Sequence, residues 1–423
     1  MKGTGSEFPW SKATVLVHGL PGSHPHGATL PPVTLSTAFE HASAEDMEAA
    51  FAHRQESFAY SRLGNPTVAA LEERVSAVSG ARGTVAVASG MSAVALALLA
   101  LVRSGDHLVA GKHVFGGTYT LLDTTLSQLG VSTTWVDERD GPAVRRAIRP
   151  ETRAVLVEAI SNPAMTVPDF DAIRGACAAH RIPLIVDATL LTPLLFDAGT
   201  TGAAVAIYSG SKFLAGAATT IGGLIVDTGS FDWGRDGPDT LAAFRRKGAL
   251  AYLSRIRDEL MVGIGPCLSP QAAFLQILGL ETLALRLERQ CSSARRIAAW
   301  LLQQPAVRSV EYPGLPSHPE HARCVRYFNG NASSVLSFAL ESRDGCYRFL
   351  NRLRLVRRAS NLGDTQSLAL HPGSTIYQAF WPAQRDELGV PDTLIRLSVG
   401  IEDAEDLLAD LAFALEDASR ANR

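Results

Sequence analysis

The stretch Ile207-Tyr208-Ser209-Gly210-Ser211-Lys212-Phe213-Leu214-Ala215-Gly216 is the part of the chain on which the fold and the chemistry both depend. It overlaps the end of an apolar run, 203–207, that predicts a buried strand, so Lys212 lies among small and apolar residues. Burying a lysine ammonium is costly unless the group is paired or neutral. Bonding to an aldehyde cofactor removes the charge, and the nearby serines could hold its phosphate. A strand-end lysine can also reach water, so the rest of the chain must decide between these interpretations.

The composition is that of a globular protein with more than one core. With 423 residues, 46% hydrophobic and 19% charged, the chain is long enough for a large and a small domain. A net charge of −3 and only short basic clusters disfavour a nucleic-acid partner. The longest apolar run, 93–102, is shorter than the ~20 residues that a membrane helix needs. We therefore expect neither nucleic acid nor a membrane as a partner.

The N-terminus and the cysteines indicate a cytoplasmic protein. Residues 1–8 resemble a cloning remnant and lack the layout of a signal peptide. The five cysteines are widely spaced, odd in number and form no CxxC pair, which is typical of reduced thiols. His18, His24 and His26 have no carboxylate or cysteine at ligand spacing, so we predict no metal site.

Helices alternate with short apolar strands from residue 61 to residue 266. This pattern is typical of an α/β fold, with a mostly parallel sheet covered by helices on both faces. Residues 1–60 are predicted to form an arm, 228–262 a connecting segment, and 267–423 a smaller C-terminal α+β domain. Seven strands are predicted in the large domain, at 84–88, 107–110, 133–136, 154–158, 184–187, 203–207 and 223–227.

Polar residues follow several of these strands. Ligands of such sheets bind at the carboxyl ends of the strands, and that rule gathers four segments at one rim. Gly90 permits close backbone approach at a helix start, where N–H groups bind anions. Asp187 ends an apolar run and would be satisfied by a protonated pyridine nitrogen, or by a helix cap or an ion pair. The four segments are Ser89 to Ser92, Glu158 to Pro163, Asp187 to Thr189 and Ser209 to Lys212.

Two arginines are candidate anion-binding residues. Arg62 offers a planar fork suited to phosphate, and Tyr60 a hydroxyl donor. Arg396 lies inside the apolar run 394–399, so it should be at least partly buried and needs an anion. That anion is either a substrate carboxylate or a structural Asp or Glu.

The order and spacing of these motifs resemble the pyridoxal-phosphate (PLP) enzymes of Cys/Met metabolism, the cystathionine synthase and lyase group, over about Val33 to Leu415. The resemblance implies an aspartate-aminotransferase-like (fold type I) PLP enzyme with a seven-stranded sheet. Its motifs are Tyr60-Ser61-Arg62, Asn65-Pro66-Thr67, Ser89-Gly90-Met91, Glu158, Asn162-Pro163, Val186-Asp187, Ser209-Gly210-Ser211-Lys212-Phe213, Leu362-Gly363, His371-Pro372 and Arg396-Leu397-Ser398-Val399-Gly400.

The resemblance also implies a role for each matching residue. Lys212 resembles the Schiff-base lysine, Asp187 the partner of the pyridine nitrogen, and Asn162 the contact of the ring hydroxyl. Further cofactor-binding positions, most of them phosphate ligands, are Ser89, Gly90, Met91, Thr189, Ser209 and Ser211.

Other implied residues bind the substrate or come from a second subunit. Arg396 resembles the residue that binds the substrate carboxylate, and Asn361 is a second substrate-binding candidate. Tyr60 and Arg62 would reach the phosphate of the neighbouring subunit. The active site would then be shared, which implies an obligate dimer or a tetramer.

Several stretches are most similar to O-acetylhomoserine sulfhydrylases, such as Asn361-Leu362-Gly363-Asp364, but the pocket departs from that pattern. Phe115 stands where relatives have a tyrosine that stacks on the cofactor and exchanges a proton with the leaving group. General acid–base help contributes about 10²–10⁴-fold, so Lys212 or Tyr60 must move that proton, or the leaving group needs no acid. Further departures are Ala188, Ala217 and Thr375-Ile376-Tyr377.

These departures predict an altered substrate pocket around a retained cofactor site. We expect γ-replacement or γ-elimination on an amino acid with a γ-leaving group, similar to O-acetylhomoserine, in a specialised pathway such as natural-product biosynthesis. The alternatives are a methionine- or cystathionine-type γ-lyase and a catalytically silent subunit, which Phe115 suggests. A nucleotide-binding α/β protein is disfavoured because no GxGxxG or GxxxxGK[ST] motif joins a strand to a helix.

Overall fold

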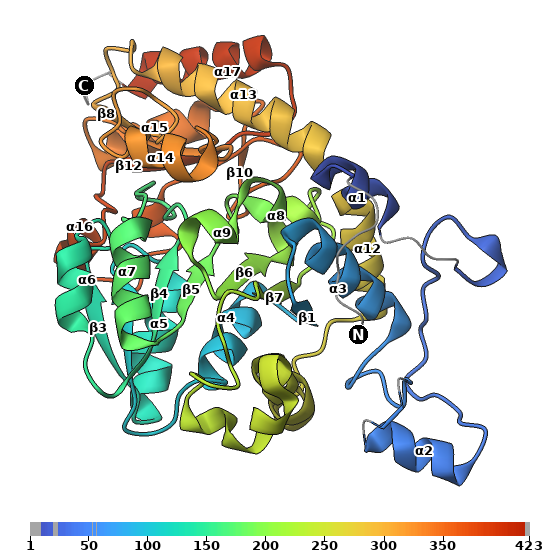
Figure 1. Cartoon of the computed structure of the whole chain (residues 1–423). Coiled ribbons are helices and arrows are strands. Elements are labelled where there is room, and N and C mark those ends of the chain that lie inside the picture. Colours follow the sequence, from blue (N-terminus) through green and yellow to red (C-terminus); the bar gives the residue numbers. More distant parts are fainter. Residues whose placement is uncertain (1–9, 20–23, 53, 56, 419–423) are drawn as a thin grey trace.

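Two β-sheets form the body of the protein (Figure 1). The computed structural model describes residues 10–19, 24–52, 54–55 and 57–418, so the expected cloning remnant at 1–8 lies outside the described residues. The large sheet has the order β1-β7-β6-β5-β4-β2-β3. Its strands are β1 Gly83–Val87, β2 His107–Gly111, β3 Ser132–Val136, β4 Thr152–Glu158, β5 Leu184–Asp187, β6 Val205–Ser209 and β7 Gly223–Asp227.

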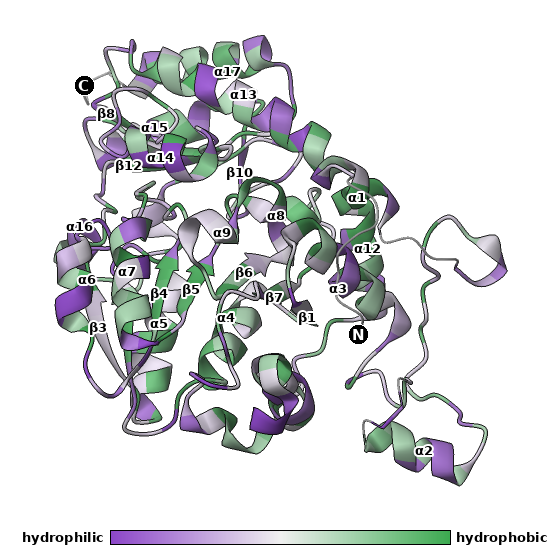
Figure 2. Ribbon diagram, viewed as in Figure 1, coloured by the Kyte–Doolittle hydropathy of each residue, from purple (hydrophilic) through white to green (hydrophobic). Residues whose placement is uncertain are grey.

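The large sheet is mostly parallel, as predicted. Strands β3, β2, β4, β5 and β6 run parallel to one another, and only β7 pairs antiparallel, with β6 and with β1. Successive residues of β4 face opposite cores: Val155 and Val157 pack in one cluster, and Ala154 and Leu156 in the other. Strands β4 and β5 are accordingly hydrophobic along most of their length (Figure 2).

Helices cover both faces of this sheet. Apolar side chains of α3 (Pro66–Ser79), α7 (Phe170–His180) and α12 (Pro270–Glu281) join the first cluster. Those of α4 (Gly90–Leu99) join the second. Shorter helices of this region are α5 Gly116–Thr120, η2 Leu121–Leu126, α6 Gly141–Ala147, α8 Thr192–Leu195, α9 Ala198–Thr201 and η3 Gly210–Leu214.

Strand β6 ends two residues later than its apolar run suggests. Tyr208 and Ser209 pair with Leu224 and Gly223 of the antiparallel strand β7, and this pairing carries the strand past Ile207. The turn that holds Lys212 therefore begins directly at the edge of the sheet.

The segment 228–262, predicted as a connection, is largely helical. Trp233 and Tyr252 are fully buried and stack with ring centroids 4.3 Å apart, so this segment forms part of the second core. Gly248, at φ 57°, interrupts the helical backbone, which explains why no regular period marks the segment. Its elements are η4 Asp239–Leu250, α10 Ala251–Arg255, η5 Ile256–Leu260 and α11 Met261–Ile264.

The second sheet has five strands in the order β10-β11-β12-β9-β8, with antiparallel pairs except β10–β11. It confirms the smaller α+β unit at the C-terminus. Two consecutive helices, α12 and α13 (Leu283–Leu301), meet at Thr282. The remaining elements are β8 Ser309–Glu311, α14 His321–Phe328, β9 Val335–Ala339, α15 Arg343–Arg352, β10 Arg357–Arg358, β11 Leu368–Leu370, η6 Pro372–Ser374, α16 Pro382–Glu387, β12 Leu394–Ser398 and α17 Ala404–Ala418.

The N-terminal region divides into a packed helix and a projecting arm. Helix α1 (Lys12–His18) lies against α3 and α12, whereas the part that carries η1 (Pro25–Gly27) and α2 (Ala44–Phe51) extends away from the body (Figure 1). The division at residues 60 and 266 stays a prediction. Among the described residues, no helix is long and apolar enough to cross a bilayer.

Candidate active site

Lys212 lies in a one-turn π-type helix that directly follows β6. Its backbone, at φ −99° and ψ −126°, leaves the helical region, and the side chain is half-buried. The Lys212 Nζ donates a hydrogen bond of 2.7 Å to Oδ1 of Asn361, which lies between β10 and β11 of the second sheet. The lysine is therefore held between the two sheets by an uncharged partner.

The environment favours the neutral amine of Lys212. Burial, and next the positive charge of Arg396, together lower its pKa from 10.5 to about 8. A lowered pKa leaves a larger neutral fraction at a given pH. At pH 7 about 10% of the amine is neutral, against less than about 0.1% for an ordinary lysine. Lys212 is thus poised to attack a carbonyl.

This pKa predicts the pH dependence of cofactor capture. When cofactor-free protein is mixed with pyridoxal phosphate, we expect the rate of appearance of the visible absorption band to rise with pH and to level off above about 8. A lysine in a short peptide should show a rate that rises until about pH 10. Stopped-flow absorbance measures both. A protein rate still rising between pH 9 and 10 contradicts the prediction.

Two carboxyl groups lie side by side at the end of the parallel strands. Glu158 of β4 and Asp187 of β5 are register partners in the sheet. Burial raises the pKa of both carboxyls, and the neighbouring Asp187 raises that of Glu158 further. Oδ1 of Asp187 accepts a 3.0 Å hydrogen bond from the Thr189 N–H. No cation among the described residues acts on the Asp187 carboxyl, so a cation such as a protonated ring nitrogen would satisfy it.

Glu158 joins the two loops that border this rim. One oxygen accepts a 2.6 Å hydrogen bond from the N–H of Phe115, and the other a 3.0 Å bond from the N–H of Asn162. The phenyl ring of Phe115 lies beside Gly117, where a Cβ would come within 2.7 Å of Phe115 Cε1 and 3.2 Å of Met91 Sδ. Phe115 and Met91 therefore lie together at the rim.

Arg396, on β12, is 2% exposed, and no carboxylate among the described residues pairs with it. Its Nη2 donates to the carbonyl of Asn361 at 2.9 Å, and its Nη1 donates to Oδ1 of Asn162 at 3.2 Å. Its Nε has no hydrogen-bond partner, and burial lowers the guanidinium pKa to about 10. An ion pair between Arg396 and a structural Asp or Glu is thus disfavoured. The guanidinium can instead bind the carboxylate of a small molecule through charge-assisted hydrogen bonds.

The expected phosphate end is built around the start of α4. Ser89 is the N-cap of that helix, and its Oγ accepts from the N–H of Ser92 at 3.0 Å, so the first-turn N–H groups face outward. A Cβ on Gly90 would lie 2.9 Å from Oγ of Ser209, so only glycine allows this approach. Ser209 is held by its N–H to Oγ1 of Thr189 at 2.9 Å, and Ser211 bonds to the backbone of Gly222. The start of the helix, the hydroxyl groups around it and the close approach of the backbone together suit a phosphate group.

Tyr60 and Arg62 do not join this site within one chain. They lie at the base of the projecting arm, where the Arg62 guanidinium stacks over the Tyr60 ring at 5.4 Å and donates to the carbonyl of Val262 at 2.7 Å. Tyr60 is 39% exposed. Their expected role requires a second copy of the chain.

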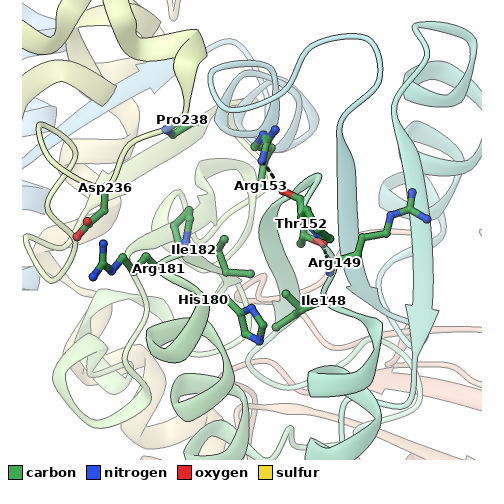
Figure 3. Close-up of a pocket in the computed structure, with 11 residues that line it drawn as sticks. Ile148, Arg149, Thr152, Arg153, His180, Arg181, Ile182, Asp236 and Pro238 are labelled. Atoms are coloured by element: carbon green, nitrogen blue, oxygen red, sulfur yellow. Dashed lines mark hydrogen bonds between the residues drawn. The ribbon is translucent and has the colours of Figure 1, made fainter.

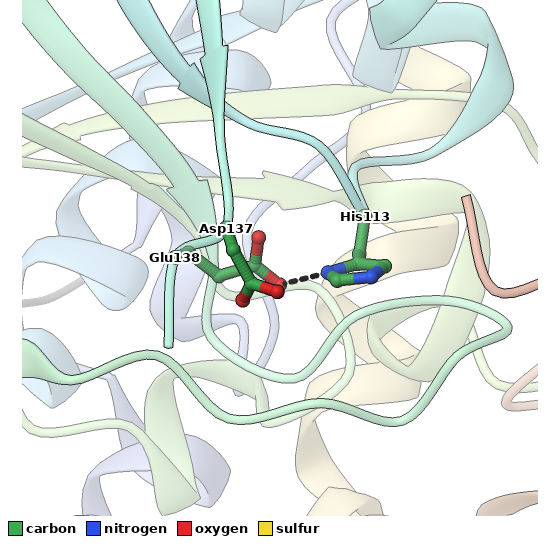
Figure 4. Close-up of side chains that lie close together, drawn as sticks. All are labelled: His113, Asp137 and Glu138. Carbon is green, nitrogen blue, oxygen red and sulfur yellow. Dashed lines mark hydrogen bonds and ion pairs between the residues drawn. The ribbon is translucent and has the colours of Figure 1, made fainter. Parts of the chain in front are cut away.

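Two other polar features do not include the residues described above. A surface hollow at the amino ends of β4 and β5, lined by Arg153, Arg181 and Asp236, lies at the opposite end of these strands from the rim (Figure 3). His113, Asp137 and Glu138 bring potential ligand atoms within 4.8 Å of one another (Figure 4). There Asp137 is paired with Arg139 and Lys112, and Glu138 accepts from His113 and Thr166, so these carboxylates have partners within the chain.

Sequence reasoning missed the connecting roles of two residues. The strand-end rule places Glu158 at the rim but gives it no role there. Tyr377 was noted only as a departure. Its hydroxyl bonds to the carbonyls of Val114 and Asn162, residues 263 and 215 positions away, and no local pattern could indicate that contact.

A poised lysine, an unpaired carboxyl and an anion-binding helix start at one sheet rim define a PLP-dependent enzyme of the fold-type-I class. Comparison with known families agrees: residues 13–416 match the family described as Cys/Met metabolism PLP-dependent enzyme, and the chain belongs to that family. Its cofactor is therefore pyridoxal 5'-phosphate, and the residues described above fit it in charge and shape.

Several proteins that this chain resembles are sulfhydrylases or thiol-lyases by name. O-acetyl-L-homoserine sulfhydrylase 1 of Thermus thermophilus is 38% identical over 415 residues, which covers 93% of this chain and 97% of the relative. Sulfhydrylase FUB7 of Fusarium oxysporum is 36% identical, covering 85% of this chain and 86% of the relative. The crystal structure of a putative O-acetylhomoserine (thiol)-lyase from Campylobacter jejuni, with N'-pyridoxyl-lysine-5'-monophosphate, has a TM-score of 0.91 and 31% identity, covering 96% of this chain and 100% of that chain.

Proposed function

We propose that this enzyme catalyses γ-replacement on an O-acetylhomoserine-like amino acid, with sulfide or a small thiol as the nucleophile. The observation that carries the proposal is Phe115: the cofactor-site residues are present, yet a phenyl ring stands where a proton donor is expected. Acetate leaves as a weakly basic anion and needs no general acid. A departing thiolate is more basic and depends more strongly on a general acid. The names of the sulfhydrylase relatives support the same substrate class.

The cofactor, when bound, supplies an electron sink that stabilises negative charge at the substrate Cα. Lys212 Nζ, whose lowered pKa makes the neutral amine more abundant than in an ordinary lysine, moves the proton at Cα. Oδ1 of Asn361 orients that Nζ by accepting its hydrogen bond. Phe115 would cover the cofactor ring and exclude water from it, and its side chain has no proton to transfer.

Arg396 binds the substrate carboxylate. The carbonyl of Asn361 and Oδ1 of Asn162 hold two of its nitrogens, which fixes the direction in which the guanidinium can accept an anion. Asn361 holds both groups, because its backbone carbonyl accepts from Arg396 and its side-chain Oδ1 accepts from Lys212, so the carboxylate-binding group and the base are positioned by one residue. That arrangement would place Cα within reach of Nζ.

A substrate panel tests the function. Purified enzyme with sulfide should turn over O-acetylhomoserine, and the O-succinyl ester, cystathionine and methionine should react more slowly. The products, homocysteine or 2-oxobutanoate, distinguish replacement from elimination. Turnover of cystathionine or methionine that exceeds that of the esters would favour a γ-lyase, the second candidate. If no compound of the panel reacts although the cofactor is bound, a specialised substrate or a catalytically silent subunit is favoured.

We further propose that two copies share each active site. The arm presents apolar side chains to solvent, among them Leu35 (75% exposed), Met47 (50%) and Phe51 (54%), which is unfavourable for a segment that stays free. Tyr60 and Arg62 at its base would then contact the phosphate of the partner. A dimer, or a tetramer of two such dimers, follows from this arrangement.

Mixing two inactive variants tests the sharing. Arg62→Ala and Lys212→Ala each impair the site alone, but a mixed dimer would contain one site with both wild-type residues. Unfolding and refolding the two together should restore up to about a quarter of wild-type activity, by random pairing of subunits. No recovery, although ultracentrifugation shows mixed oligomers, contradicts a shared site.

The proposed location is the cytoplasm. The cysteines in the described part of the chain form no disulfide, and burial raises the pKa of Cys177, Cys291, Cys324 and Cys346 to about 12, which keeps their thiols protonated. Unreactive, unpaired thiols suit a reducing compartment.

A further inference from the structure

Tyr377 places one buried hydroxyl between the two loops that border the cofactor site. The residue follows η6 in the C-terminal part of the chain and is 1% exposed. Its hydroxyl donates a shared hydrogen bond to the carbonyl of Val114, at 3.2 Å, and to that of Asn162, at 3.1 Å. Val114 directly precedes Phe115, so the hydroxyl holds the peptide that carries the stacking ring.

Glu158 holds the same two loops through their backbone N–H groups, whereas Tyr377 holds them through backbone carbonyls. Its carboxyl accepts from the N–H groups of Phe115 and Asn162, whereas Tyr377 donates to the carbonyls of Val114 and Asn162. Both a donor and an acceptor thus tie residues 114–115 to residue 162. Asn162 in turn accepts from Arg396, so its position also sets that of the guanidinium.

Aromatic packing fixes Tyr377 itself. Its ring lies 5.3 Å from that of Phe380, which meets Tyr119 edge-on at 5.4 Å, and Tyr119 stacks on Trp135 at 4.2 Å. Tyr119 lies on α5, the helix that starts directly after Phe115. The cluster therefore joins the Phe115 helix to the C-terminal part of the chain.

The hydroxyl is unsuited to replace the proton donor missing at position 115. It already donates to backbone carbonyls, and burial raises the pKa of Tyr377 well above its ordinary value. A phenol that keeps its proton and is committed to two acceptors orients groups rather than titrating.

We propose that Tyr377 is a positioning residue, whose hydroxyl sets the place of Phe115 against the cofactor ring and of Asn162 beside it. This role rests on the proposed cofactor contacts of Phe115 and Asn162, but it does not depend on which substrate the enzyme uses. A side chain at 377 without a hydroxyl would leave two buried carbonyls poorly paired and let both loops shift.

Tyr377→Phe tests the proposal with readouts other than turnover. We expect cofactor-free protein to bind pyridoxal phosphate about tenfold more weakly, a change of about 1.4 kcal/mol, because a hydrogen bond that orders the site is lost. The induced circular dichroism of the visible band, per cofactor bound, should also change, since that signal reports the asymmetric surroundings of the ring.

Tyr312→Phe is the matched control. Tyr312 is equally buried, and its hydroxyl donates to the carbonyl of Ser333 at 2.9 Å, but it lies outside the cofactor site. Thermal unfolding of both cofactor-free variants measures the purely structural cost. Weaker binding and altered dichroism in Tyr377→Phe alone support the proposal. Unchanged binding and dichroism, or an equal loss in both variants, overturn it. Absence of turnover with every γ-substituted amino acid would contradict only the proposed function.

Discussion

Replacing Lys212 with alanine is expected to abolish both the visible absorption band of the bound cofactor and catalysis. The band depends on a covalent bond to Nζ, which alanine cannot form. Loss of proton transfer at Cα alone should cost about 10²–10⁴-fold in rate, and loss of the attachment adds to that. Absorbance after dialysis against pyridoxal phosphate, and turnover of O-acetylhomoserine with sulfide, measure the two effects.

Lys247→Ala is the control for this experiment, because Lys247 lies in η4 and is exposed. It should keep the wild-type band and rate. Borohydride reduction of the wild type followed by peptide mapping should place the cofactor on the peptide that contains Lys212. A label on another lysine, or a band that persists in Lys212→Ala, would show that the attachment site is misassigned.

The sequence predicts the rim of this site because the rim is a property of parallel strands. Apolar runs locate the parallel strands β5 and β6, and the polar residues at or just beyond the ends of these runs, Asp187 and Ser209, lie at one edge of the sheet. Glu158 follows by the same logic. The seven-stranded sheet and the second, smaller sheet are confirmed for the same reason, since strand periodicity is local.

Contacts between distant segments could not be predicted in this way. Asn361 meets Lys212 across 149 residues, and only the packing of the second sheet against the first decides that meeting. The burial of Arg396 was predicted from its apolar neighbours, but the absence of a carboxylate partner among the described residues is visible only in three dimensions. The places of Tyr60 and Arg62 depend on a second chain and stay predictions.

Phe115→Tyr is expected to change the enzyme's preference between leaving groups. A tyrosine hydroxyl beside the cofactor could protonate a departing thiolate, and general acid help of this kind is worth about 10²–10⁴-fold. We therefore expect kcat/KM for cystathionine to rise by about 10²-fold or more, while that for O-acetylhomoserine changes by no more than a few fold. The backbone should stay in place, because Glu158 and Tyr377 hold it through peptide groups that the substitution leaves intact.

Phe244→Tyr provides the matched control, since Phe244 is half-buried in the second core, outside the rim, and the same oxygen is added there. It should alter neither rate. If Phe115→Tyr raises both rates equally, the hydroxyl assists a step common to all substrates, and Phe115 does not select the leaving group. If rates and products stay unchanged, the residue at position 115 does not determine the reaction or the leaving group. Ala188, Ala217 and Tyr377 would then be the next positions to test, because each departs from the family pattern.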